Sequence, residues 1–176
     1  MFPLPLSCYK METLHFEKTT ELKKNLKLLK EKLEVSLSLK NKTLSLEGEP
    51  IKEYEASKVL EAMQFGFSAE KALLLKEDFM FKVFHIRDFT RRKNLKDVKA
   101  RIIGKRGKTK NTIENLTESY LIIKENEIGA ITPLSSSENL TTALENLIKG
   151  AKQSNIYRFL EKSNTTKRTN NLKLKE

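Results

Sequence analysis

A short stretch near the middle of the chain combines two glycines with dense positive charge. It runs Arg101-Ile-Ile-Gly-Lys-Arg-Gly-Lys-Thr-Lys110, so that Gly104 and Gly107 flank a pair of cations. Because glycine lacks a Cβ atom, this spacing favours a tight turn whose backbone can come close to a ligand. If a helix begins at Lys108, its unpaired amide groups and the positive end of its dipole would favour an anion such as phosphate.

The excess positive charge of the chain lies on the segment that leads into this turn. The 176 residues carry a formal net charge of +11. Residues 79–110 hold 12 basic and 2 acidic residues, whereas residues 1–78 hold 13 of each and residues 111–176 hold 9 and 8. A localised basic segment is typical of a protein that binds a polyanion. A solvated lysine-rich surface is the alternative, but the adjoining glycine turn favours the polyanion.

Several classes of protein are not expected. No apolar run is long enough for a transmembrane helix. The single cysteine, Cys8, excludes an internal disulfide and is typical of a reducing compartment such as the cytoplasm. With only His15 and His85 beside it, no metal-ligand cluster is expected. The glycine turn lacks the earlier glycine of a nucleotide-binding phosphate loop, so we expect neither an enzyme nor a cofactor.

Hydrophobic periodicity divides the chain into two halves of α/β type. In the first half, a weak strand at Lys10–Phe16 precedes a helical stripe formed by Leu22, Leu26, Leu29 and Leu33. Alternating leucines in residues 35–39 and 44–46 predict a hairpin. A helix is expected to begin at Pro50, and residues 68–75 predict a short connecting helix.

The second half repeats this order with one elaboration. Residues 79–89 predict a buried strand, and residues 95–102 predict a helix that runs into the glycine turn. A second helix, strands at residues 120–123 and 128–131, and a helix capped by Ser135 and Glu138 are expected to follow. The polar tail from Ser163 is expected to be disordered.

Three separated motifs resemble one known family. Residues Arg101–Thr117 resemble the second KH domain of the small-subunit ribosome-assembly factors called Partner of Nob, or Dim-type, proteins. Residues Phe65–Leu73 resemble the segment that joins the two KH modules of that family. Residues Ile156–Glu161 resemble its closing helix in an archaeal form. The resemblance implies two tandem type I KH modules, each a three-stranded sheet packed by helices.

The implied organisation has five parts. They are an N-terminal extension (residues 1–9), a first KH module (10–67), a linker helix (68–78), an RNA-binding KH module with a C-terminal helix (79–162) and the basic tail (163–176). The first module is expected to be degenerate, because the region Phe16–Leu26 contains no glycine where archaeal members of this family carry a clamp. We therefore expect the first module to pack and to contact protein rather than RNA.

The resemblance also implies a function. It implies binding of single-stranded rRNA or pre-rRNA near the 3′ end during small-subunit assembly, next to a Nob-type endonuclease and to platform proteins of the pre-small subunit. For archaeal relatives it implies a contact with the alpha subunit of translation initiation factor two. The alternatives are an exosome-type RNA-decay cofactor, which would usually carry an S1-like β-barrel, and a protein scaffold with incidental RNA binding.

The residues expected to contact RNA surround the glycine turn, by which KH domains hold about four nucleotides. Cations at the start of a helix oppose its dipole, so Lys108 and Lys110 argue for an anionic ligand. Ile103 and Ile122 are expected to line a groove for bases, and Ile113 fits that groove or the core equally well. The other predicted RNA-binding residues are Gly104, Lys105, Arg106, Gly107, Thr109, Arg101, Arg91, Arg92 and Lys93. For Thr109, a bond to RNA and a bond to the backbone are equally open.

Overall fold

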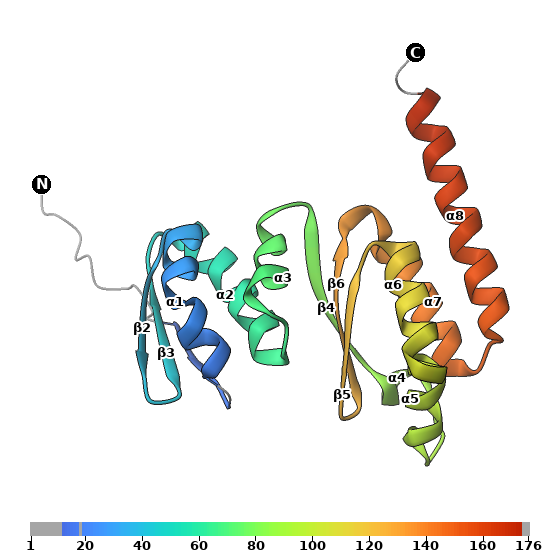
Figure 1. Cartoon of the computed structure of the whole chain (residues 1–176), viewed down its shortest axis with the longest axis horizontal. Helices are drawn as coiled ribbons and strands as arrows, with labels where there is room; N and C mark the ends of the chain where they lie inside the picture. Colours follow the sequence, from blue (N-terminus) through green and yellow to red (C-terminus); the bar gives the residue numbers. More distant parts are fainter. Residues whose placement is uncertain (1–11, 18, 174–176) are drawn as a thin grey trace, which may run out of the picture. The chain divides into compact units, whose positions relative to one another are not determined.

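The computed structural model describes residues 12–17 and 19–173 (Figure 1). The chain divides into two compact units, residues 1–77 and residues 78–176. The connecting helix predicted just before this division is α3 (Ala69–Leu73), which continues into the 3-10 turn η1 (Leu74–Lys76). The predicted N-terminal extension lies outside the described residues.

The first unit is a three-stranded antiparallel sheet with helices. Besides α3 and η1, its elements are β1 (Glu12–His15), α1 (Thr20–Leu33), β2 (Ser36–Lys40), β3 (Thr43–Glu47) and α2 (Pro50–Phe65). The strands lie in the order β1-β3-β2. Leu22, Leu29 and Leu33 of the predicted helical stripe are buried, whereas Leu26 is partly exposed. Leu37, Leu44 and Leu46 of the predicted hairpin are buried as well, and Leu39 is partly exposed, so hydrophobic periodicity placed these elements correctly.

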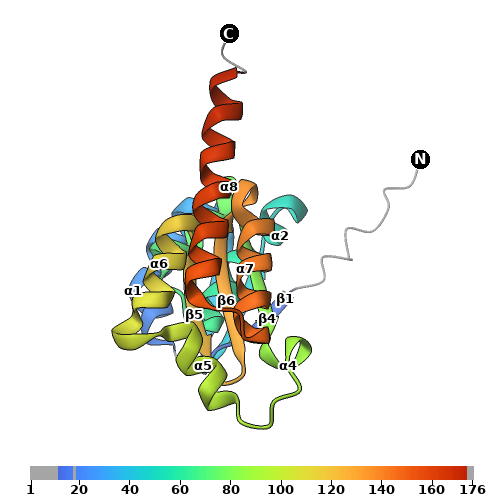
Figure 2. The ribbon, with the colours of Figure 1, turned by 90° about the vertical axis from the view of Figure 1, so that its right-hand side faces the viewer.

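The second unit has the same strand order in its sheet, β4-β6-β5. Helices α5, α6 and α7 cover one face of this sheet (Figures 1 and 2). Its elements are β4 (Phe79–His85), α4 (Ile86–Phe89), α5 (Leu95–Ile103), the 3-10 turn η2 (Lys105–Gly107), α6 (Lys108–Thr117), β5 (Tyr120–Lys124), β6 (Glu127–Pro133), the 3-10 turn η3 (Leu134–Ser136), α7 (Ser137–Lys149) and α8 (Gln153–Lys173). The predicted α/β fold with two three-stranded sheets is confirmed.

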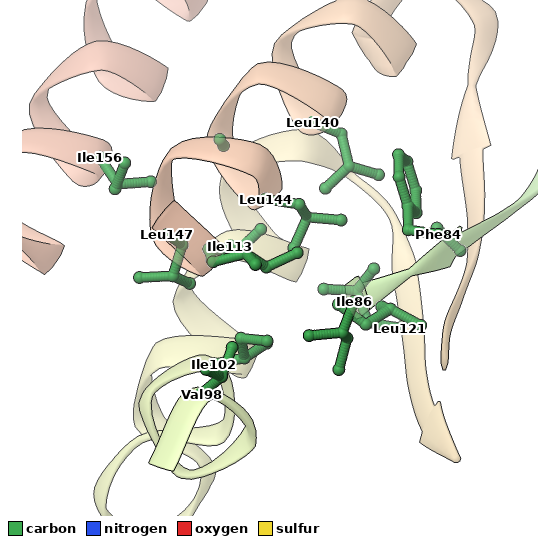
Figure 3. Close-up of a cluster of buried hydrophobic side chains, with 14 of the residues drawn as sticks. Phe84, Ile86, Val98, Ile102, Ile113, Leu121, Leu140, Leu144, Leu147 and Ile156 are labelled. Carbon is green, nitrogen blue, oxygen red and sulfur yellow. The ribbon is translucent and has the colours of Figure 1, made fainter. Parts of the chain in front are cut away.

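The hydrophobic core of the second unit lies between its sheet and its helices (Figure 3). Every element of the layer contributes to it: Phe84, Ile86, Val98, Ile102, Ile113, Leu121, Leu140, Leu144, Leu147 and Ile156 are all buried. Full burial of one such side chain stabilises a fold by about 1.5–3 kcal/mol. The second unit therefore has a core of its own, and this core fixes the two helices on either side of the glycine turn.

The strand predicted for residues 79–89 ends earlier, at His85. Its partner strand β6 begins at Glu127, directly opposite His85, so no partner remains for a longer β4. The next amide, on Ile86, donates instead to the carbonyl of Asn126 in the β5–β6 turn at 2.9 Å. The following residues form the short helix α4, which buries Ile86. The strand is also only partly buried before Phe84, contrary to the prediction.

Two further predictions in the second unit were wrong. Ser135 does not cap α7, because it lies within the 3-10 turn η3 and the helix begins at Ser137. The described part of the predicted tail, residues 163–173, is helical rather than disordered, because α8 continues to Lys173. Polar composition suggested disorder, but no Gly or Pro interrupts residues 153–173, and Asn164 Nδ2 donates to the Leu116 carbonyl at the end of α6 at 2.6 Å.

Candidate nucleic-acid interface

The glycine turn connects α5 to α6 through three residues with positive φ. Gly104 has φ 73°, Arg106 has φ 53° and Gly107 has φ 78°. The Gly107 amide donates to the Gly104 carbonyl at 3.2 Å and closes the turn. A non-glycine residue in this region costs about 1–2 kcal/mol, and such strain is concentrated at functional sites. The Arg106 side chain is exposed, so the strained residue presents a cation at the tip of the turn.

Gly104 and Gly107 differ in the space that a side chain would have at each position. A Cβ atom on Gly104 would overlap Thr109 Oγ1 and lie 2.8 Å from both the Cβ and the backbone N of Thr109. A Cβ atom on Gly107 would meet nothing closer than the Asn111 side chain, at 3.9 Å. The sequence predicted a tight turn in which the backbone at both glycines could come close to a ligand. Gly104 instead packs against Thr109, whereas at Gly107 the backbone stays open to a ligand.

A Gly104→Ala substitution is therefore expected to destabilise the fold. The added methyl group must displace a buried threonine from a core-facing position, and such overpacking costs about 1–3 kcal/mol. Urea denaturation of the intact protein should show a lower midpoint with an unchanged slope. Gly107→Ala is the matched control, because it has a similar φ but open space around it, and it should cost less. Equal losses in the two variants would contradict this account of Gly104.

The first turn of α6 has no side-chain cap, and of its amides the first, on Lys108, donates to the Lys105 carbonyl. Its N-cap is Gly107, and no acidic residue lies in the first turn. The positive end of a helix dipole attracts anions, and here it coincides with the exposed Lys108. Lys110 is less available, because its Nζ lies 3.2 Å from Glu114 Oε1 and both side chains are partly buried. The beginning of α6 is thus suited to a phosphate group.

The exposed cations and the apolar residues lie on separate elements around this turn. Lys105 and Arg106 are exposed on the turn itself, and Arg91, Arg92 and Lys93 are exposed in the loop between α4 and α5. Ile103, the last residue of α5, is 39% exposed, although most isoleucines of this unit are buried. Ile122 is partly exposed on β5.

Comparison with known proteins identifies the second unit. A family model of the second KH domain of PNO1, described as "Eukaryotic type KH-domain (KH-domain type I)", matches residues 80–165. A KH domain-containing protein of Methanocaldococcus jannaschii is 29% identical over 65% of this chain and 51% of its own length. RNA-binding protein PNO1 of Oryzias latipes is 31% identical over 72% of this chain and 57% of its own length. Residues 80–165 are therefore similar to the second KH domain of PNO1, and both relatives are KH-domain or PNO1 proteins.

Solved structures share the fold of this chain. A protein of unknown function from Aeropyrum pernix is 26% identical, with a TM-score of 0.77 over 93% of this chain and 97% of its own. Dim2p from Pyrococcus horikoshii, 22% identical over 87% and 99% of the two chains, has the same fold with a TM-score of 0.76. A chain of the a/eIF2alpha–aDim2p–rRNA complex from Pyrococcus horikoshii has a TM-score of 0.73 at 20% identity over 87% and 93%. The resemblance seen in the sequence is confirmed, although this chain spans about half the length of the curated relatives it matches.

Two residues near the KH turn belong to the interior rather than to the surface. Thr109 is only 2% exposed and lies directly under Gly104, so its hydroxyl cannot reach RNA without opening the turn. Ile113 is fully buried in the core of the KH domain (Figure 3). Of the two positions left open by the sequence, Thr109 is therefore withdrawn as an RNA contact and Ile113 is a core residue.

Arg101 does not point toward the glycine turn. Its Nη1 atom is 3.0 Å from the position of a Cβ atom on Gly150, at the C-terminal end of α7. The guanidinium of Arg92 is 3.2 Å from the same position. Sequence reasoning placed both arginines on one basic surface with the turn but missed their common neighbour, Gly150, since only the tertiary fold brings the end of α7 beside α5.

The first unit lacks the helix–turn–helix that carries the glycines of the KH domain. Among the described residues, a single helix, α1, lies between β1 and β2 in the chain. Phe16, at the start of this connection, is 3% exposed, and its amide donates to the Lys42 carbonyl at 2.8 Å. Within residues 12–17 and 19–77, no glycine turn stands between a first and a second strand, in agreement with the degenerate first module that the sequence predicts.

No three His, Cys, Asp or Glu side chains among residues 12–17 and 19–173 are grouped so that they could hold a metal ion. No helix in the same part of the chain is long and apolar enough to cross a membrane.

Proposed function

We propose that the chain binds single-stranded rRNA or pre-rRNA through its second KH domain during assembly of the small ribosomal subunit. The observation that carries this proposal is the open backbone at Gly107, which lies at the uncapped beginning of α6 beside the exposed side chains of Lys105, Arg106 and Lys108. This combination can clamp phosphates of a single strand. Ile103 and Ile122 would contact bases, and the exposed Arg91, Arg92 and Lys93 would extend the basic surface.

The names of the relatives support the same proposal. Curated relatives are called RNA-binding protein PNO1, and a structural relative lies in a complex of a/eIF2alpha, aDim2p and rRNA. We therefore propose rRNA near its 3′ end as the ligand and the alpha subunit of initiation factor two as one protein partner. The other proposed partners are a Nob-type endonuclease and platform proteins of the pre-small subunit, and the proposed location is the cytoplasm. The proposed modules are residues 10–67 and 79–162, joined by residues 68–78. The role is binding rather than catalysis.

Crosslinking in cells, followed by sequencing of the bound RNA, tests the ligand. Reads concentrated at the 3′ end of small-subunit rRNA or its precursor are the expected result. Reads spread over messenger RNA would instead support an RNA-decay cofactor. Few reads with abundant protein crosslinks would support a scaffold with incidental RNA binding, so either of these outcomes would overturn the proposal.

RNA affinity is expected to depend strongly on salt. If the turn and the basic segment neutralise about four to six phosphates, log K should fall against log salt with a slope of about −3 to −4 for single strands. The reason is the release of counterions from the RNA when cations of residues 79–110 replace them. Filter binding between low and moderate salt measures this slope. A slope near zero would mean that this segment is not the RNA surface.

A further inference from the structure

Two arginines converge on Gly150, at the point where α7 ends and the chain turns toward α8. Arg92 reaches it from the loop before α5, and Arg101 reaches it from α5 itself. Glycine is required there, because its φ is +113° and a Cβ atom would crowd both guanidinium groups, at 3.0 and 3.2 Å. The backbone of α5 is held at the same place, since Gln153 Nε2 donates to the Arg101 carbonyl at 3.2 Å. These contacts form a cluster of two guanidinium groups, which we call the Arg92–Arg101 pair.

The positive charge of this pair has no counter-charge in the described part of the chain. Neither arginine takes part in an ion pair among residues 12–17 and 19–173. Arg101 Nη1 is inaccessible to solvent, yet it has no hydrogen-bond acceptor. A buried donor without an acceptor costs about 1–3 kcal/mol. The pair therefore combines like-charge repulsion with an unsatisfied donor. A phosphate bound at the exposed Arg92 and at the accessible atoms of the Arg101 guanidinium would remove the repulsion, while the buried Nη1 itself stays out of its reach.

The partial negative charge at the C-terminal end of α7 does not balance the charge of the Arg92–Arg101 pair. The C-terminus of a helix carries about −0.5 of an elementary charge, whereas two guanidinium groups carry a charge of two. The Asn146 carbonyl at this end already accepts two hydrogen bonds, because the Gly150 and Ala151 amides both donate to it, at 3.0 and 2.9 Å. About three quarters of the positive charge thus stays uncompensated. Planar guanidinium groups with several donors match the oxygen atoms of a phosphate group.

We propose that the Arg92–Arg101 pair binds a phosphate group of an RNA nucleotide that flanks the segment held by the glycine turn. This inference rests on the proposed function and adds a second phosphate-binding position to it. Arg101 lies three residues before Gly104 on α5, which corresponds to about 4.5 Å along the helix axis. In a DNA duplex, successive phosphates of one strand rise by about 3.4 Å. An RNA strand with a similar rise that runs from the glycine turn back along α5 therefore comes level with Arg101 within one or two nucleotides.

The test compares two RNA lengths taken from the 3′ end of small-subunit rRNA. One RNA has about four nucleotides, the length that a KH turn holds, and the other has about twelve. Arg92→Gln and Arg101→Gln in the full chain should each weaken binding of the longer RNA about three- to tenfold and reduce the salt slope by about 0.7, the value for one phosphate. Binding of the shorter RNA should stay unchanged. Lys96→Gln, an exposed position on α5, is the control with the same change of charge.

The outcomes separate the two proposals. If wild-type protein binds neither RNA, the proposed function fails and this inference fails with it. If the wild type binds both RNAs but both arginine variants behave like Lys96→Gln, the pair is structural and the inference alone is overturned. If both arginine variants weaken the two RNAs equally, the pair belongs to the turn itself and a second position is excluded. If Arg101→Gln lowers the melting temperature of the protein, the proposal is tested with Arg92→Gln alone, because Arg92 is exposed.

Discussion

Gly107→Asp is expected to lower RNA affinity at least tenfold, or by about 1.4 kcal/mol, while the protein stays folded. The carboxylate would lie at the beginning of α6, where phosphate is proposed to bind, and would repel it. The fold should tolerate the change, because a Cβ atom on Gly107 meets nothing closer than 3.9 Å and aspartate adopts the left-handed region at modest cost. Circular dichroism and fluorescence anisotropy of the same samples measure fold and affinity together.

Gly107→Asn is the matched control for this experiment. Asparagine has nearly the same size as aspartate and tolerates the same backbone, but it carries no charge. A loss with aspartate alone would identify charge repulsion as the cause, and a similar loss with both would identify blocked approach to the backbone. Gly104→Asp cannot replace this variant, because the side chain would collide with the buried Thr109. A folded Gly107→Asp protein with wild-type affinity would exclude the turn as the RNA site.

Local patterns predicted most elements of the fold, because helix and strand periodicities are properties of neighbouring residues. The buried face of α7, Leu140 to Ile148, follows directly from apolar residues spaced three and four apart. Features that depend on the partner of an element were missed. The end of β4 at His85 is fixed by the point where β6 begins, and α8 continues past Ser163 although its sequence there is polar.

In the candidate site, too, local features could be predicted from the sequence and features that depend on tertiary contacts could not. The glycine spacing and the run of basic residues are visible in the sequence, and they predicted the turn and the exposed Lys105, Arg106 and Lys108. The interior role of Thr109 could not be predicted, because it depends on how closely α6 passes Gly104. Nor could the sequence place Arg101 beside Gly150, since residues 49 positions apart meet only when α5 packs against α7. A charge pattern identifies candidate contacts, but only the fold decides which way each side chain points.

The RNA affinity of the chain is expected to reside almost entirely in its second unit. Residues 1–78 have no net charge, and the described part of the first unit contains no glycine turn between β1 and β2. A fragment of residues 78–176 should fold, because its sheet and helices enclose a hydrophobic core of their own (Figure 3). We expect this fragment to bind RNA within about threefold of the intact chain, which corresponds to less than about 1 kcal/mol.

The decisive comparison uses the intact chain, the fragment and the Gly107→Asp variant on one RNA at one salt concentration. Cooperative urea unfolding of the fragment must be established first, since only a folded fragment tests the idea. Binding to pre-small-subunit particles is then measured alongside RNA affinity. If the first unit contacts protein, the fragment should lose particle binding while its RNA affinity is kept. A folded fragment that loses as much RNA affinity as Gly107→Asp would make the first unit a true RNA reader. Helix α1, the single helix between β1 and β2, would then have to contact the RNA without a glycine turn.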